Sequence, residues 1–234
     1  MIAASLLAVL MSQNVCASAL VEARALAVRM DTDGAVARLE AGAGTGCDVE
    51  VPVAFLRALT VARAASARGG DEASLRPIKS LLAVIERRAQ PGSSEEIAVL
   101  LIHAATAAAQ SEHDELFAYL SQALQVERAR GVRRLAGAPI LTAHEVAGEL
   151  WLEVYRYDDA AAAFRIARGA SGDSPRLLAG LARALARQRS TADACTEYRR
   201  LSTDASARVP SMERELAEAE AFLAQPACRA GEAR

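Results

Sequence analysis

Two stretches of the sequence share one pattern of residue size and polarity at a fixed offset. The first is AGELWLEVYRYDDAAAAFRIA, from Ala147 to Ala167, and the second is LARALARQRSTADACTEYRRL, from Leu181 to Leu201. Corresponding positions lie 34 residues apart, although few of them are identical. A period of this length is typical of stacked helix hairpins, because no single hairpin can bury its own apolar face. The two stretches therefore predict an α-helical array.

The repeated positions are of two kinds, small residues where paired helices cross and large residues that fill the space between hairpins. The small pairs are Gly148 with Ala182 and Ala160 with Ala194, and the large pairs are Trp151 with Leu185 and Phe164 with Tyr198. The first copy adds Tyr157 as a large position and Ala167 as a small one. This pattern resembles the tetratricopeptide repeat family, most clearly over residues 141–174 and 175–208, although the turn of the first copy lacks the family's usual Gly. The resemblance implies an α-solenoid of stacked antiparallel hairpins. A generic bundle of Ala-rich helices is the alternative.

The composition favours the same fold class. Hydrophobic residues make up 52% of the chain and aromatic residues only 4%, so the core must be built mainly from Ala, Leu and Val. Ala and Leu are strong helix formers, and clusters of β-branched residues that would indicate strands are scarce. We expect an all-α protein with a single repeat domain over residues 20–228, a capping helix at 210–224 and a tail at 229–234.

The first residues have the character of a signal peptide. An apolar run from Ile2 to Met11 precedes the small-x-small pattern that ends at Ala19, which predicts cleavage of residues 1–19 and a periplasmic or secreted protein. Against this, no Lys or Arg occurs before Arg24, so a cytoplasmic protein with an apolar first helix is the alternative. No apolar stretch is long enough to span a bilayer.

The cysteines carry a second prediction. Cys195 lies in the first turns of one expected helix, and the next helix runs back antiparallel, which returns Cys228 to the same end. We therefore expect a disulfide between them, in an oxidising compartment. Cleavage after Ala19 would remove Cys16 and leave Cys47 as the remaining thiol, most simply a small buried residue.

The sequence gives no pattern of catalytic, metal-ligating or cofactor-binding residues. His103, His113 and His144 are scattered, and no His-plus-acid pattern supports Cys47 as a nucleophile. A net charge of −2 lacks the basic footprint of a nucleic-acid-binding protein. We expect a protein that is not an enzyme and needs no cofactor or metal, with a Cys47-dependent hydrolase as a minor alternative.

Charged stripes indicate where a partner could bind. One stripe is Glu145, Glu149 and Glu153, and the other is Arg176, Arg183 and Arg187. By resemblance to the family, both face a concave groove that would take a protein or peptide partner, with the arginines holding an acidic group. The alternative is that the two stripes neutralise each other between neighbouring helices. The expected function is non-catalytic protein recognition; the alternative is an architectural subunit of a bacterial envelope complex.

Overall fold

The computed structural model describes residues 16–44, 47–131 and 140–229. Within these ranges every regular element is a helix, which confirms the all-α class. Contacts gather the chain into two compact units, one comprising Met1–Ala27 and Asp31–Leu141, the other Val28–Met30 and Thr142–Arg234. We call them unit 1 and unit 2 and describe each by itself. A single repeat domain over residues 20–228 stays a prediction.

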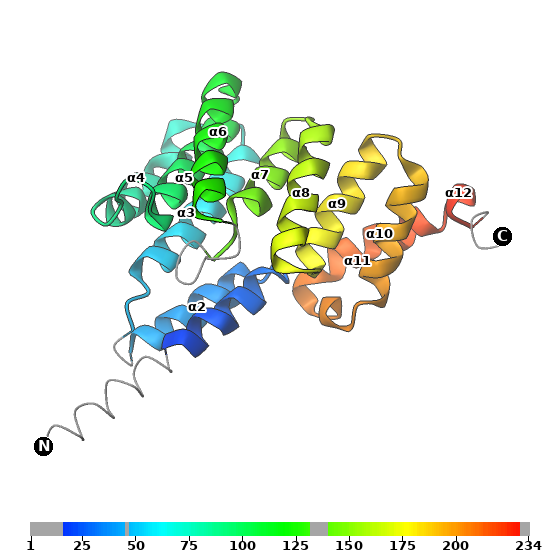
Figure 1. The fold of residues 1–234 in the computed structure, drawn as a ribbon, viewed down its shortest axis with the longest axis horizontal. Helices are drawn as coiled ribbons and strands as arrows, with labels where there is room; N and C mark the ends of the chain where they lie inside the picture. Colours follow the sequence, from blue (N-terminus) through cyan, green and yellow to red (C-terminus); the bar gives the residue numbers. More distant parts are fainter. Residues whose placement is uncertain (1–15, 45–46, 132–139, 230–234) are drawn as a thin grey trace, which may run out of the picture. The chain divides into compact units, whose positions relative to one another are not determined.

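Unit 1 is a set of helices in which chain neighbours pack side by side (Figure 1). After a helical stretch at residues 16–27 come α2 (Thr32–Ala43), α3 (Glu50–Ser66), α4 (Glu72–Glu86), α5 (Ser94–Gln110) and α6 (His113–Arg130). Short breakers with side-chain caps separate several of them: the side chains of Asp31, Asp71 and Ser93 each accept a hydrogen bond from a backbone N–H of the following helix. The unit is thus built from local helix signals and joined by α3, which packs against α2, α4 and α5.

Unit 2 contains the two stretches that share the sequence pattern. Its helices are α7 (Ala143–Glu153), α8 (Tyr157–Ser171), α9 (Pro175–Arg187), α10 (Thr191–Thr203), α11 (Glu213–Leu223) and α12 (Pro226–Arg229). The expected 210–224 helix is a short 3-10 turn at Pro210–Met212 followed by α11. In the chain order α7 to α11 each helix packs against the next (Figure 1). The unit therefore consists of neighbouring helix pairs, as the pattern predicts.

The start of α7 is fixed by a capping box. Thr142 Oγ1 accepts from the Glu145 backbone N–H at 3.1 Å, and the Glu145 carboxylate accepts from the Thr142 backbone N–H at 2.6 Å. The two residues satisfy two helix-terminal donors reciprocally. At the start of α9, Ser174 is the N-cap and Pro175 occupies the first helical position, where its missing N–H costs nothing.

The core of unit 2 is organised around the ring of Phe164, which is 1% exposed. A Cβ built on Gly148 of α7 would lie 2.6 Å from this ring, and one built on Gly180 of α9 would lie 2.5 Å from it. Two helices therefore approach the same ring closely, each through a residue without a side chain. The small position at Gly148 was predicted, whereas Gly180 was not.

Most residues of the predicted packing set lie in this core. Eight are fully or almost fully buried: Gly148, Ala160, Phe164, Ala167, Ala182, Leu185, Ala194 and Tyr198. Trp151 is half-buried and packs against the core from its edge. Tyr157 is half-buried at the start of α8.

The two hairpin turns of unit 2 repeat one backbone conformation. Tyr155 follows α7 with φ 62° and Arg189 follows α9 with φ 64°, and the two lie 34 residues apart. In the first turn, Tyr155 N–H donates to Leu152 O and Arg156 N–H donates to Trp151 O; in the second, Arg189 and Ser190 donate likewise to Ala186 and Leu185. This is the Schellman motif, whose left-handed position is usually taken by Gly.

The described part of the chain contains two disulfides. Cys195 and Cys228, whose Cα atoms are 5.6 Å apart, are joined as the antiparallel arrangement predicts. Cys16 and Cys47 form the second bond, with Cα atoms 5.2 Å apart. This corrects the prediction of Cys47 as a leftover thiol, which assumed loss of Cys16. Ala19, next to the predicted cleavage point, is fully buried and packs against Gly42.

Part of the terminal predictions lies outside the described residues, namely residues 1–15 of the expected signal peptide and 230–234 of the expected tail. Arg229, the first residue of that tail, ends α12. In the part of the chain that the structure describes, no helix is both long and apolar enough to cross a membrane.

Candidate interaction surface at the α7–α8 turn

Four of the six predicted groove residues make contacts within unit 2. Glu145 is fully buried in the capping box of α7, so its carboxylate does not line an open groove. Glu149 pairs with Arg176 across α7 and α9, with Arg176 Nε 2.6 Å from Glu149 Oε1 and Nη2 2.7 Å from Oε2. Their side chains are only 13% and 2% exposed. For these two residues, neutralisation between neighbouring helices is the arrangement found.

Arg183 is also satisfied within unit 2. Its guanidinium donates to Glu218 on α11, and Glu215 lies 3.7 Å away. These contacts, with Glu218 first, raise the pKa of Arg183 despite its partial burial. Two predicted groove residues remain exposed: Glu153 and Arg187, which end α7 and α9.

A polar hollow of about 500 Å³ lies where α7 turns into α8. It is lined by Tyr155, Arg156, Tyr157, Asp158, Asp159 and Gln188. We call this the α7–α8 turn surface. Gln188 caps α9, next in the chain to Arg187, and its side-chain amide donates to the Tyr157 backbone O at 2.9 Å. The hydrogen bond ties the end of α9 to the start of α8, so the turn has a fixed support.

Aromatic side chains gather at this surface in a chain that has few of them. Tyr155 is 76% exposed. The Tyr155 and Tyr157 rings meet edge to face with centroids 6.3 Å apart. The Arg156 guanidinium lies over the Trp151 ring at 5.7 Å and is 2.6 Å from Asp159. The side chains beside Tyr155 are therefore held in defined positions before any partner arrives.

The chemistry of this arrangement suits recognition of another protein. Tyr, Trp and Arg are the residue types that most often dominate the energy of protein interfaces, because they offer large rigid area with a polar tip. The sequence analysis identified Trp151 and Tyr157 only as packing residues and did not identify Tyr155. The signal was present in the sequence: at Tyr155 a large aromatic residue stands in the turn after a helix, where Gly is the usual residue.

No family model, no curated protein and no solved structure matches the chain. Membership of the tetratricopeptide repeat family therefore stays a prediction. Over residues 16–44, 47–131 and 140–229, no group of three or more His, Cys, Asp or Glu side chains is placed to hold a metal ion.

Proposed function

We propose that the protein is a non-catalytic interaction module that binds a protein segment at the α7–α8 turn surface. The observation that carries this proposal is the backbone of Tyr155. A non-Gly residue with φ near +60° costs about 1 kcal/mol relative to Gly, and a bulky aromatic residue is uncommon there. Tyr155 is 76% exposed, so core packing does not offset that cost. Strain kept without a packing benefit points to a use for the side chain. Arg189 has the same backbone conformation, so what distinguishes Tyr155 is its exposed aromatic ring next to Tyr157 and the Arg156–Trp151 pair.

We also propose that unit 2 is a pair of tetratricopeptide-like repeats with α11 as a capping helix. The two left-handed turn residues lie 34 residues apart, the same offset as the sequence pattern, which supports this proposal. The packing of each helix against the next supports it as well. In such arrays the hairpin ends and the concave face are both available to partners. Glu153 and Arg187, the two predicted groove residues that stay exposed, flank the α7–α8 turn surface in sequence.

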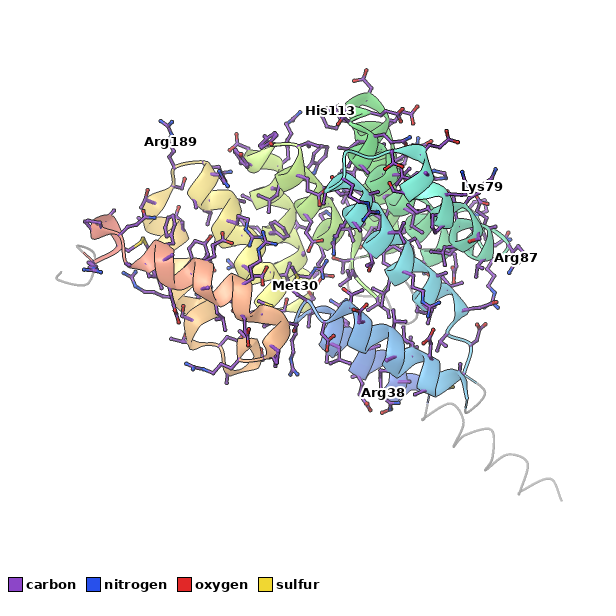
Figure 2. The ribbon with its side chains drawn as sticks, turned by 180° about the vertical axis from the view of Figure 1, so that it is seen from behind. Met30, Arg38, Lys79, Arg87, His113 and Arg189 are labelled. Carbon is purple, nitrogen blue, oxygen red and sulfur yellow. A yellow bond between two sulfur atoms is a disulfide. The ribbon has the colours of Figure 1, made fainter. Side chains whose placement is uncertain are left out.

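Site-specific photo-crosslinking in the host tests the proposal. Benzoylphenylalanine placed at Tyr155 should give a discrete heavier species after irradiation, whereas the same group at Arg189 should give none. Arg189 is a matched control, because it has the same backbone conformation at the equivalent turn and projects into solvent (Figure 2). Equal adducts at both positions, or none at Tyr155, would contradict the proposal.

Glycine variants separate binding from folding. Tyr155→Gly and Arg189→Gly should each raise the unfolding free energy by about 1 kcal/mol, because both relieve a positive φ. Only Tyr155→Gly should bind the partner more weakly, with an affinity lower by more than tenfold, measured with the partner protein identified from the crosslinked adduct. A loss of affinity in both variants would mean that the turns act on binding through the backbone rather than through Tyr155.

A further inference from the structure

Unit 1 carries a groove that the proposed function does not use. Two hollows, of about 340 and 470 Å³, adjoin along α2, α3 and α4 and share Glu40 and Leu81 in their linings. One is lined near Cys47 and the start of α3, the other near the start of α2 and Pro77 of α4. Because they share these two lining residues, we treat the two hollows as one surface and call it the α2–α4 groove.

Each helix contributes one stripe of residues at helical spacing. The stripes are Asp33, Val36, Ala37, Glu40 and Ala43 on α2; Glu50, Val53, Ala54, Arg57, Thr60 and Val61 on α3; and Pro77, Ser80, Leu81 and Val84 on α4. Residues three and four apart lie on one face of a helix, so each stripe is a continuous wall. From Asp33 to Ala43 the α2 wall rises about 15 Å, the length of roughly three helical turns.

Aliphatic side chains in the groove are left partly open. Val36, Val53, Val61, Leu81 and Val84 are all half-buried in a unit whose other large aliphatics are mostly covered. On α4 the contrast is direct, because Leu75, Ile78 and Ile85 are buried on the side that faces α3 and α5. Covering these open side chains with a partner would contribute about 25 cal/mol of favourable free energy for each Å² of apolar surface removed from water.

The rim of the groove is acidic. The carboxylates that line it are those of Asp33, Glu40, Asp48 and Glu50, and two guanidinium groups form ion pairs with three of them. Arg57 pairs with Glu40, and Arg88 pairs with both Asp48 and Glu50. With four carboxylates and two guanidinium groups, the rim carries a net negative charge, and it surrounds an apolar floor.

We infer that the α2–α4 groove binds an amphipathic helix of a partner protein, with an apolar face toward Leu81 and Lys or Arg residues at its flanks. The wall length matches three turns, so apolar anchors at i, i+3 or i+4, and i+7 of the guest would fit the floor. Basic flanks complement the acidic rim and select against acidic guests. This site is independent of the α7–α8 turn surface, so the chain has two docking surfaces on two units, as an adaptor would.

The experiment uses synthetic helical peptides of about 14 residues with Leu at the anchor positions. One peptide carries Lys at both flanks, and its matched partner carries Glu there. Fluorescence anisotropy with the full chain should give a dissociation constant of about 10–100 μM for the Lys peptide and at least tenfold weaker binding for the Glu peptide. Added salt should weaken the first interaction, because the rim charges are exposed.

Two variants locate the peptide. Leu81→Arg should reduce binding at least tenfold, because it removes the shared floor residue and adds repulsion. Lys79→Ala is the control, since Lys79 lies on the same helix but points away into solvent (Figure 2) and should bind the peptide unchanged. Circular dichroism of both variants checks that they are folded. Unchanged affinity of Leu81→Arg, or equal affinity for the two peptides, would overturn the inference.

Two further measurements test whether something other than a partner helix occupies the α2–α4 groove. If a chain that lacks residues 1–15 binds the Lys peptide at least tenfold better than the full chain, the groove belongs to this chain's own apolar segment. If sedimentation shows self-association that Leu81→Arg abolishes, it belongs to a second copy. Either result overturns a separate partner helix, and neither affects crosslinking at Tyr155, so the failures of the two proposals can be told apart.

Discussion

The Arg183 guanidinium on α9 donates to the carboxylate of Glu218 on α11, with Nε 3.1 Å from one oxygen and 3.2 Å from the other. Tyr198 of α10 donates its hydroxyl to the same carboxylate at 2.7 Å. One acid thus joins three consecutive helices. An arginine that the sequence analysis placed in a partner groove is occupied by the capping helix, so Arg183→Ala should weaken the fold itself by leaving Glu218 without its cation.

This contact should make stability depend on pH. Burial alone would raise the pKa of Glu218, but the hydrogen bonds from Arg183 and Tyr198 outweigh burial and lower it. A carboxyl whose pKa is lower in the folded state stabilises the fold above its unfolded pKa, near 4.5, and loses that contribution as pH falls through the folded value. At neutral pH the wild-type protein should therefore unfold at a higher urea concentration than Glu218→Gln. The difference between the two urea midpoints should become smaller in acid. The exposed Glu220→Gln on the same helix should show no such narrowing.

Glycines that contact Phe164 should not tolerate a methyl group. Gly148→Ala or Gly180→Ala would gain helix propensity but force the ring to move, and the ring is held from both sides. We expect a net destabilisation of about 1–3 kcal/mol for each, the usual range for overpacking. Gly169→Ala on α8 is the control, because its Cβ would meet nothing within 4 Å. That variant should be stabilised by about 0.5–1 kcal/mol in thermal unfolding. If Gly148→Ala left the free energy of unfolding unchanged, the Phe164 ring would have room to move.

The buried pair of Arg176 and Glu149 should be costly to break. Arg176→Ala leaves a carboxylate that is 13% exposed without its cation, which typically costs about 3–5 kcal/mol. Replacing both residues by Met should recover most of that loss, because an apolar pair needs no charge compensation. By contrast, Arg57→Ala breaks an ion pair between half-exposed side chains and should cost less than about 1 kcal/mol. Denaturant unfolding of the four proteins measures the comparison.

The sequence predicts what depends on local spacing and fails where two distant elements meet. The helices and the small and large positions of unit 2 follow from periodicity, and the structure has them. The role of Gly180 does not, because it arises only where α9 meets a ring on α8.

The charged residues show the same limit. Helical spacing placed Glu145, Glu149 and Glu153 on one stripe, but spacing does not say which members of a stripe are covered. Packing buries Glu145, half-buries Glu149 and leaves Glu153 exposed. The partners of Cys47 and Arg183 lie on segments that the sequence analysis did not bring together.

The two disulfides give the last prediction, which concerns the protein as it leaves its host. Purified without reductant and after thiol alkylation, it should have no alkylated cysteine and be two hydrogens lighter for each bond than the reduced chain. This outcome requires an oxidising compartment. It also requires that Cys16 be retained, because Cys16 is bonded to Cys47. A mature protein that begins after Ala19 would contradict the Cys16–Cys47 bond while leaving Cys195–Cys228 intact.

Variants that lack one bond measure what each disulfide contributes. The bonds span 31 and 33 residues, and on the chain-entropy model loops of that size stabilise by about 3–4 kcal/mol each. Cys195→Ser with Cys228→Ser should lower stability by that amount, and Cys16→Ser with Cys47→Ser should do the same. Each pair is the control for the other, because they close different units and nearly equal loops. A Cys16–Cys47 pair that could be removed at no cost would mean that the N-terminal helix of unit 1 is held by packing alone, with Ala19 against Gly42 as its anchor.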